Sequence, residues 1–199
     1  MFDSTKKAES NILNQDIKLD EVYNDLCQKS VSAFHLFNQP ISVDVDLEKV
    51  EDVYFEYQKR YHPDNFSEDI EKIKATQVCK KINDLCDCLY KPFCRLEIML
   101  ECAGFSKDKI LTQTVQSSSM LAFMFELKDE LEETHSQDDL LSLIKKVTLL
   151  IEEGEKKFQI LYDQKIFEQS AGQLIEQYQE LCFLYKTLVS AKQKNKKFQ

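Results

Sequence analysis

Apolar residues recur every three or four positions along most of the chain, which is the spacing that places them on one face of an α-helix. In the N-terminal half, this pattern predicts a helix over 46–61, a long helix that starts at about 67–69, and a short helix that ends at Gly104. Pro63 ends the first of these, because proline lacks an N–H and disfavours helical geometry in the residue before it. Pro92 separates the second from the third and suits the first turn of a helix. The apolar stripe expected for the long helix consists of Ile70, Ile73, Val78, Ile82, Leu85 and Leu89.

Three more helical patterns follow in the C-terminal half: one over 118–134, one beginning at Ser136 and one beginning at Ser170. Each of the two serines has a polar partner three residues on, which is the spacing of a capping box. Gly154 interrupts the middle pattern, at a cost of about 1 kcal/mol relative to alanine. Three amphipathic helices with short connections predict an antiparallel three-helix bundle. The basic end of the chain, from Ala191 on, is expected to fray.

The predicted fold class is therefore all-α, with two domains. We expect an N-terminal extension over 1–30, either disordered or a short helix, a first domain over 31–105, a linker over 106–113 and a bundle over 114–199. Three glycines and three prolines in 199 residues are too few for the tight turns of a β-sandwich or barrel. No two glycines are close enough to form a Gly-rich phosphate loop, which excludes the common nucleotide-binding enzymes.

Charge and hydropathy narrow the range of partners. The 26 basic and 35 acidic residues give a net charge of −9, so nucleic acid and anionic membranes are poor partners. No apolar run approaches the roughly 20 residues of a membrane span. Residues 1–20 have neither the apolar core of a secretory signal nor the Arg-rich, acid-poor composition of a mitochondrial presequence. We expect a bacterial cytoplasmic protein, or a mitochondrial matrix protein if residues 1–30 are an unusual leader.

The chain has seven cysteines, no two of which form a C-x-x-C pair. We expect them to be reduced thiols in a reducing compartment, most of them small core residues. Neither these cysteines nor the three histidines have metal-ligand spacing, so we expect no metal site and no cofactor. A rival hypothesis is a thiol-dependent metal or redox carrier. It would use Cys79, Cys86, Cys88 and Cys94, although the middle two lie about 200° apart on a helix and cannot share one ligand site.

The most informative residues lie at the break between the first two helices, where residues 61–66 read Tyr-His-Pro-Asp-Asn-Phe. The simplest explanation is a helix–helix turn in which Asp64 caps the next helix. No nucleophile–base pair or acid pair has a supporting context, and we expect no catalytic residue.

These residues make the chain resemble the J-domain proteins, in which a His-Pro-Asp loop joins two antiparallel helices and stimulates ATP hydrolysis by a 70-kDa heat-shock chaperone. More specifically, it resembles the HscB-type co-chaperones of iron–sulfur cluster assembly. The resemblance implies that Asp64 offers a carboxylate to a chaperone arginine, Pro63 holds the loop rigid, and His62 packs or hydrogen-bonds in the turn. It also implies that Lys59 and Arg60 steer the encounter. The other matching stretches are Phe34–Phe37 with Pro40, Ile82-Asn83, Leu89, Pro92, Arg95, Glu97, Leu100, Gly104-Phe105, Glu126–Leu131 and Phe183-Leu184.

Two departures from the family concern the loop and its helix. Asn65 stands where the family usually has lysine. The helix over 46–61 has only Lys49, Lys59 and Arg60 as cations, against the acids Glu48, Glu51, Asp52 and Glu56. A helix face with so few cations predicts weaker, salt-sensitive binding to an acidic chaperone surface.

A second candidate surface comes from projecting the helix over 118–134 at 100° per residue. Leu121 and Phe125 fall away from its apolar stripe, and Phe183 lies off the stripe of the last helix. The projection predicts an exposed apolar patch with an acidic rim, unless another helix or the first domain covers it. In the HscB family, the matching residues bind the scaffold IscU. They are Leu121, Ala122, Phe125, Glu126, Asp129, Glu133 and Phe183, of which Ala122 is smaller than the family's usual residue.

The sequence thus predicts a J-domain over 31–105 and a client-binding bundle over 114–199. The function that the resemblance implies is a non-enzymatic co-chaperone that delivers an IscU-like scaffold to an HscA-like chaperone and promotes ATP hydrolysis there. A general J-domain co-chaperone with a different client is the closest alternative.

Overall fold

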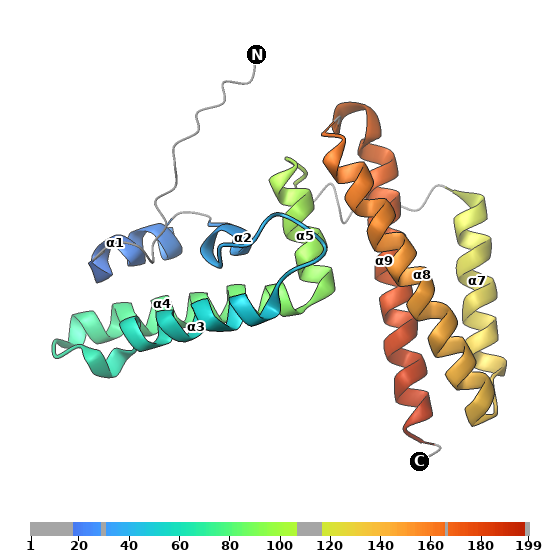
Figure 1. The fold of residues 1–199 in the computed structure, drawn as a ribbon, viewed down its shortest axis with the longest axis horizontal. Coiled ribbons are helices and arrows are strands. Elements are labelled where there is room, and N and C mark those ends of the chain that lie inside the picture. The colour runs from blue at the N-terminus through green and yellow to red at the C-terminus, as the bar shows by residue number, and fades with distance from the viewer. Residues whose placement is uncertain (1–17, 29–30, 107–116, 166, 198–199) are drawn as a thin grey trace. The chain divides into compact units, whose positions relative to one another are not determined.

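The structure is a computed structural model that describes residues 18–28, 31–106, 117–165 and 167–197. Every regular element in these residues is helical, which confirms the predicted all-α fold class (Figure 1). The chain divides into two compact units, residues 1–99 and 100–199. The expected linker over 106–113 lies almost entirely outside the described residues, so the domain boundaries stay predictions.

The first unit is built around an antiparallel pair of helices, α3 and α4, joined by a short loop (Figure 1). Helix α1, the π-helix η1 and helix α2 pack against α4. Its elements are α1 (Leu19–Tyr23), η1 (Asn24–Gln28), α2 (Ala33–Leu36), α3 (Leu47–Tyr61), the 3-10 helix η2 (Pro63–Asn65), α4 (Asp69–Tyr90) and α5 (Pro92–Cys102), whose last residues belong to the second unit.

The short helix allowed for within residues 1–30 is present, and it is part of the first unit's core. Leu19, Val22 and Leu26 are buried. Lys74 of α4 forms an ion pair with Asp20 at 2.6 Å. Residues 1–17, where the extension could have been disordered, lie outside the described part of the chain.

Helix α3 begins and ends where the sequence predicts. The Asp46 side chain accepts a hydrogen bond from the Lys49 N–H at 3.2 Å and so caps the first turn. Val50, Tyr57 and Tyr61 face the core. The Tyr57 hydroxyl donates to the Leu36 carbonyl at 3.3 Å, which ties α3 to α2.

The apolar stripe predicted for α4 is wrong in its first two members. Ile70 and Ile73 are 67% and 59% exposed. Counted at 100° per residue, they lie about 140° and 160° from Ala75, on the outer face of the helix. The break was visible in the sequence, because Ile73 and Val78 are five residues apart and five is not a helical spacing. The buried stripe is Ala75, Val78, Cys79, Ile82, Cys86 and Leu89.

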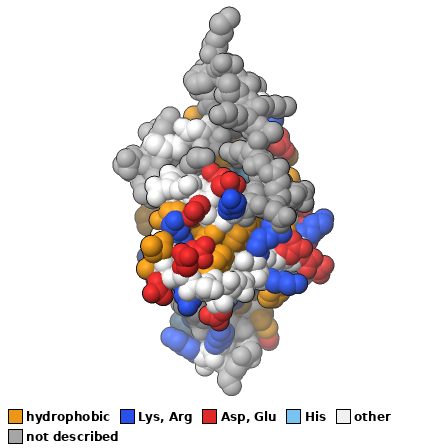
Figure 2. All heavy atoms as spheres, turned by 90° about the vertical axis from the view of Figure 1, so that its left-hand side faces the viewer, with side chains coloured by type: hydrophobic (Ala, Val, Ile, Leu, Met, Phe, Trp, Pro, Cys, Tyr) orange, Lys and Arg blue, Asp and Glu red, His pale blue; other side chains and the backbone are white. Residues whose placement is uncertain are grey.

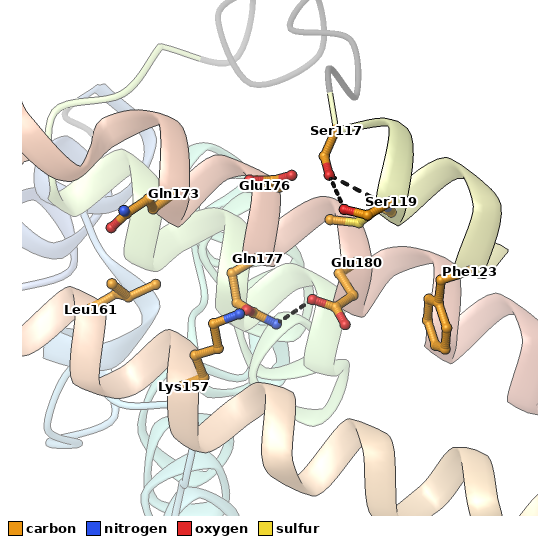
Figure 3. Close-up of a pocket in the computed structure, with 10 residues that line it drawn as sticks. Ser117, Ser119, Phe123, Lys157, Leu161, Gln173, Glu176, Gln177 and Glu180 are labelled. Carbon is orange, nitrogen blue, oxygen red and sulfur yellow. Dashed lines mark hydrogen bonds between the residues drawn. The ribbon is translucent and has the colours of Figure 1, made fainter.

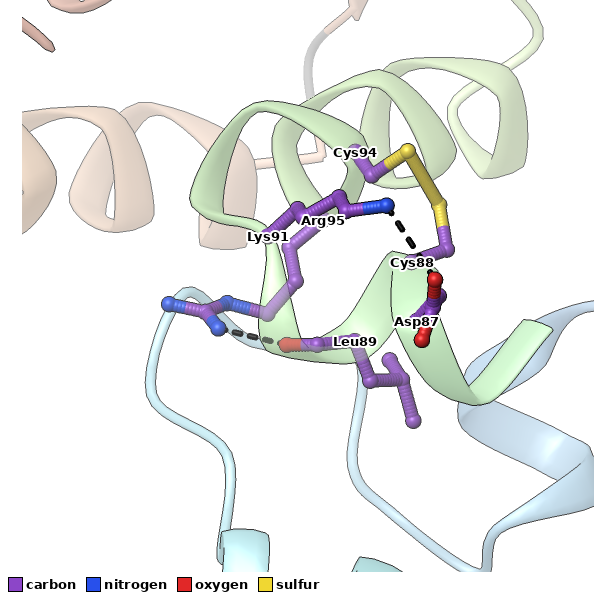
Figure 4. The surroundings of a disulfide bond; sticks show 6 residues. All are labelled: Asp87, Cys88, Leu89, Lys91, Cys94 and Arg95. Atoms are coloured by element: carbon purple, nitrogen blue, oxygen red, sulfur yellow. Dashed lines mark hydrogen bonds and ion pairs between the residues drawn. A yellow bond between two sulfur atoms is a disulfide. The ribbon is translucent and has the colours of Figure 1, made fainter. Parts of the chain in front are cut away.

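At the corner between α4 and α5, the expectation of reduced thiols is wrong for one pair. Cys88 and Cys94 form a disulfide across Pro92, with their Cα atoms 5.0 Å apart (Figure 4). The helix break brings together two cysteines that no short motif links. Arg95 supports the same corner by donating to the Leu89 carbonyl at 2.6 Å (Figure 4).

Helix α5 stops as predicted near Gly104, whose φ of +90° suits glycine. The N–H of Gly104 bonds the Glu101 carbonyl, and the N–H of Phe105 bonds the Leu100 carbonyl. This pair of bonds is a Schellman ending, which satisfies carbonyls that the helix leaves open.

The second unit contains the predicted three helices, α7 (Ser118–Glu133), α8 (Gln137–Asp163) and α9 (Phe167–Asn195). Both α8 and α7 pack against α9. Helix α8 runs unbroken through Gly154. A Cβ at this position would lie 2.9 Å from Leu181 Cδ2 of α9. The glycine lets α8 and α9 approach closely. The buried core includes Leu140, Leu143, Val147, Phe158, Leu174, Ile175, Leu181 and Leu184.

Helix ends in this unit are capped partly as predicted. Ser136 accepts the Asp139 N–H at 3.1 Å, as expected. Ser170 is not a cap, because α9 already begins at Phe167. The prediction that the chain frays from Ala191 on is wrong up to residue 195. The Lys194 ammonium donates to the Leu131 carbonyl at 2.7 Å, and so holds the end of α9 against the end of α7. None of the described helices is long and apolar enough to cross a membrane.

Candidate functional site

The loop between α3 and α4 presents the His-Pro-Asp sequence to solvent. Asp64 has 91% of its side chain exposed, and the His62 imidazole is about half exposed. Pro63 begins the 3-10 turn η2. A binding role requires that these residues be accessible; His62 and Asp64 are exposed, and Pro63 is partly exposed.

Hydrogen bonds within the turn fix its shape. His62 Nδ1 accepts the Asp64 N–H at 3.3 Å, as expected for a histidine that bonds within the turn. The Asn65 N–H donates to the His62 carbonyl at 2.9 Å, and the Phe66 N–H donates to the Pro63 carbonyl at 3.2 Å. Because proline also restricts its own φ, the turn has little conformational freedom.

The loop is also anchored to the last turn of α3, which is itself held against α4. Asn65 Nδ2 donates to the Lys59 carbonyl at 2.8 Å and lies 3.4 Å from the Arg60 carbonyl. These carbonyls belong to the last turn of α3, where carbonyl groups have no helical N–H four residues on to bond. The Tyr61 ring stacks on Tyr57 with centroids 6.2 Å apart, and the Cys79 thiol of α4 donates to the Tyr61 carbonyl at 3.2 Å. Burial raises the pKa of Tyr61.

The simpler explanation of the loop, a turn in which Asp64 caps the next helix, does not fit the structure. Glu68 occupies the N-cap position of α4, and no side chain bonds the first turn there. Asp64 Oδ2 lies 3.5 Å from His62 Nδ1, and the rest of the carboxylate faces solvent. An exposed carboxylate on a rigid turn can accept two parallel hydrogen bonds from a guanidinium.

Charged and apolar side chains surround the loop. The face of the molecule at this end of the hairpin carries basic, acidic and hydrophobic groups side by side (Figure 2). Lys59 and Arg60 are exposed on the last turn of α3. The exposed Ile70 and Ile73 begin α4 just beyond the loop, and the sequence reasoning missed this apolar pair by assigning it to the core.

The α7 surface has the predicted exposure. Leu121 is exposed and Phe125 is 64% exposed, whereas Leu127 of the opposite stripe is buried. Phe183 of α9 is partly exposed. The other members of the predicted surface are also exposed; they are Ala122, Glu126, Asp129 and Glu133. Within the second unit, no described helix covers Leu121 or Phe125. The binding role of the surface stays a prediction.

A cavity of about 550 Å³ lies on the other flank of α7 (Figure 3). Met120 and Phe123 of α7 line it, and at 100° per residue they fall at least 100° from Leu121 and Phe125. Within it, Gln177 Nε2 donates to Glu180 at 3.0 Å (Figure 3). The cavity is therefore separate from the predicted scaffold surface. Its lining is Ser117, Ser119, Met120, Phe123, Lys157, Leu161, Gln173, Glu176, Gln177 and Glu180.

The thiols proposed for a metal or redox carrier are not assembled into one site. Cys88 is bonded to Cys94, and Cys79 is buried against the Tyr61 carbonyl. Burial, with nearby acidic groups, raises the pKa of Cys86 to about 11, which disfavours the thiolate that metals require. In the part of the chain that the structure describes, no three or more His, Cys, Asp or Glu side chains could hold a metal ion together.

Known proteins provide an independent comparison. No protein-family model matches the chain. It is 32% identical over 149 residues to a co-chaperone protein HscB homolog of Shewanella amazonensis, covering 66% of this chain and 85% of that protein. It is 27% identical over 135 residues to the co-chaperone protein HscB of Proteus mirabilis, covering 67% and 76%.

Two solved structures share the fold. The chaperone HscB from Vibrio cholerae has a TM-score of 0.70 at 24% identity and is covered completely, against 85% of this chain. The human co-chaperone protein HscB has a TM-score of 0.73 at 22% identity, with 83% of this chain and 82% of that chain covered. With a J-domain, a helical bundle and this degree of likeness to curated relatives, the chain belongs to the HscB co-chaperone family.

Proposed function

We propose that the chain stimulates ATP hydrolysis by an HscA-like 70-kDa heat-shock chaperone and delivers an IscU-like scaffold to it during iron–sulfur cluster assembly. The observation that carries the proposal is the exposed Asp64 carboxylate on a turn that is fixed by a hydrogen bond within it and by another to the last turn of α3. Membership of the HscB family supports the same conclusion. No catalytic step is assigned to the chain itself.

The loop would act as a preformed contact. Asp64 accepts hydrogen bonds from a chaperone arginine, and the charge on both groups strengthens them. Because the turn is ordered before binding, little conformational entropy is lost when the contact forms. ATP hydrolysis accelerates if the loop binds more tightly to the hydrolysing state of the chaperone than to its resting state.

Steering of the encounter would rest on the last turn of α3. Lys49, the other cation of this helix, is already paired with Asp46 at 2.8 Å. Lys59 and Arg60 are the cations of α3 that lie beside the loop. Because charges of this kind act mainly by steering, the association rate should fall as salt is added, while the maximal stimulation should not change.

The scaffold would bind the exposed side of α7. Leu121 and Phe125 supply an apolar centre, and Glu126, Asp129 and Glu133 supply an acidic rim. This layout fits a partner with an apolar patch edged by basic residues. Carrying both sites on one chain raises the local concentration of the scaffold at the chaperone, provided that both can be occupied together.

A single-turnover ATP hydrolysis assay tests the chaperone part. The protein should stimulate an HscA-type chaperone more than a general DnaK-type chaperone. His62→Gln should abolish stimulation and leave the helical circular dichroism spectrum unchanged. His135→Gln, at an exposed histidine between α7 and α8, is the matched control and should behave like the wild type. Stimulation that survives His62→Gln would contradict the proposal.

Calorimetric titration tests the scaffold part. The double variant Leu121→Ala/Phe125→Ala should bind an IscU-type scaffold at least about tenfold more weakly, because exposed aromatic and apolar anchors dominate binding at such surfaces. Leu149→Ala, at an exposed leucine of α8, is the control. Unaltered affinity would show that the scaffold binds another face of the protein. If the wild type does not bind the scaffold but still stimulates the chaperone, a general J-domain co-chaperone with another client would be favoured.

The proposed place of action is a bacterial cytoplasm, with the mitochondrial matrix as the alternative for a eukaryotic source. The bacterial origin of curated relatives supports the first. The Cys88–Cys94 disulfide runs against it, since disulfides are rare in reducing compartments. Trapping the thiol state in intact cells with an alkylating reagent would distinguish a reduced pair from an oxidised one.

A further inference from the structure

A groove on the first unit lies between α3 and α4, away from the His62–Asp64 loop. Its volume is about 430 Å³. Phe55, the lining residue of α3 nearest the loop, is seven residues before His62, or about 10 Å along the helix axis. A hydrogen bond of 2.8 Å from Gln58 to Asn83 joins the two helices between groove and loop. The lining residues are Glu51, Tyr54, Phe55, Asn83, Cys86, Asp87 and Tyr90.

Aromatic rings form much of the groove's accessible wall. Phe55 is 58% exposed and Tyr90 is 44% exposed, on facing helices. Tyr54 packs edge-on against Phe55, with ring centroids 5.8 Å apart. Neighbouring aromatic rings left open to water on a folded unit are a common feature of partner-binding surfaces.

The electrostatic character of the groove is negative. Glu51 and Asp87 line it, and both act with burial to raise the pKa of Cys86 on its floor. Among the described residues that line it, none is lysine or arginine. Lys91 lies 3.3 Å from Asp87 in an exposed ion pair, which water screens and which a stronger partner can displace. The sign of the charge excludes nucleic acid and anionic lipid and favours a cationic occupant.

We propose that this groove binds a basic segment of a partner protein by receiving an arginine side chain. A guanidinium is planar and weakly hydrated, so it can stack on Phe55 or Tyr90 while donating hydrogen bonds to Glu51 and Asp87. Lysine matches the charge but not the flat aromatic walls. The site is independent of the loop and of the α7 surface, so it does not rest on the function proposed above.

The test uses a short synthetic peptide, acetyl-Leu-Arg-Leu-Arg-Leu-amide, and the same peptide with citrulline in place of arginine. Citrulline keeps the shape of the side chain and removes its charge. Each is titrated into the full-length ¹⁵N-labelled protein at low salt. The arginine peptide should shift the amide resonances of residues 51–55 and 83–90, and the citrulline peptide should shift them at least about tenfold more weakly.

Variants then locate the charges. Glu51→Gln/Asp87→Asn should weaken arginine-peptide binding about tenfold. Glu48→Gln/Asp84→Asn, which neutralises two exposed carboxylates of the same helices outside the groove, should change it less than twofold. Phe55→Gln provides a second variant that tests the aromatic wall should the double variant unfold, and it should also weaken binding.

Three results of the peptide titrations would overturn the proposal. The first is that the arginine peptide does not shift the amide resonances of the groove. The second is that the arginine and citrulline peptides shift them equally. The third is that the groove variant and the control variant lose the same affinity for the arginine peptide. Groove shifts that depend on protein concentration without peptide would assign the groove to a second copy of the chain, and would likewise overturn it.

Discussion

Asn65→Ala is the substitution that best separates the order of the loop from its chemistry. Asn65 Nδ2 donates to the Lys59 carbonyl at 2.8 Å and approaches the Arg60 carbonyl at 3.4 Å. One well-formed hydrogen bond of this kind contributes about 1 kcal/mol. In Asn65→Ala both carbonyls can still accept hydrogen bonds from water, so the substitution should destabilise the loop by about 1 kcal/mol and not much more.

The expected consequence is a loop that spends less time in its binding shape. A free energy of about 1 kcal/mol corresponds to roughly a fivefold change in an equilibrium. The apparent affinity falls in proportion to the competent fraction. Asn65→Ala should therefore raise the concentration of co-chaperone needed for half-maximal stimulation by up to about fivefold. The stimulation at saturation should not change, because Asp64 is still present.

Asn83→Ala is the matched control. Asn83 accepts a hydrogen bond from Gln58 at 2.8 Å, which also joins parts of the hairpin but does not touch the loop. Both variants should lower the free energy of unfolding by about 1 kcal/mol in urea titrations. Only Asn65→Ala should move the half-maximal concentration in single-turnover assays. Equal half-maximal concentrations for the two variants would refute the role given to Asn65.

Three further predictions concern stability and thiol chemistry. Gly154→Val should lower the free energy of unfolding by about 1–3 kcal/mol, because even a Cβ at this position would lie 2.9 Å from Leu181. Gly172→Ala is the comparison: a Cβ there would meet open space, so alanine should raise the free energy of unfolding by up to about 1 kcal/mol. Burial raises the pKa of Tyr162 from 10.0 to about 12. The neutral phenol is favoured in the fold, so its stabilising effect is complete below pH 10 and lost as pH rises through 12. Between pH 8 and pH 11 the free energy of unfolding should fall by about 1.4 kcal/mol because of this group, and the fall should be smaller by that amount in Tyr162→Phe. Alkylation of unreduced, denatured protein should modify all the cysteines except Cys88 and Cys94, as read by intact mass, whereas modification of all seven would contradict the disulfide.

Much of the helical framework follows from local signals. Pro63 and Pro92 mark helix breaks because their ring chemistry acts on adjacent residues alone. Asp46 and Ser136 cap their helices through bonds that span three residues. The outward position of Leu121 and Phe125 also follows from periodicity, because the rest of α7 supplies a complete apolar stripe without them.

Features that depend on distant neighbours were not predictable in the same way. The five-residue gap between Ile73 and Val78 marks a break in the stripe of α4, but which face of α4 is buried is settled only where the helix meets α3. Ser170 has the spacing of a cap, yet α9 begins earlier. The Lys194 contact with the Leu131 carbonyl joins residues 63 positions apart. The groove between α3 and α4 likewise appears only when the two helices are placed side by side.

The most direct test of the central claim is the rate of single-turnover ATP hydrolysis by an HscA-type chaperone with Asp64→Asn protein at saturating concentration. The substitution removes the negative charge that an arginine would bind and keeps nearly the same shape. Stimulation should be lost with Asp64→Asn, while Asp84→Asn, at an exposed carboxylate of α4, should stimulate like the wild type. Full stimulation by Asp64→Asn would show that the loop carboxylate is not the chaperone contact.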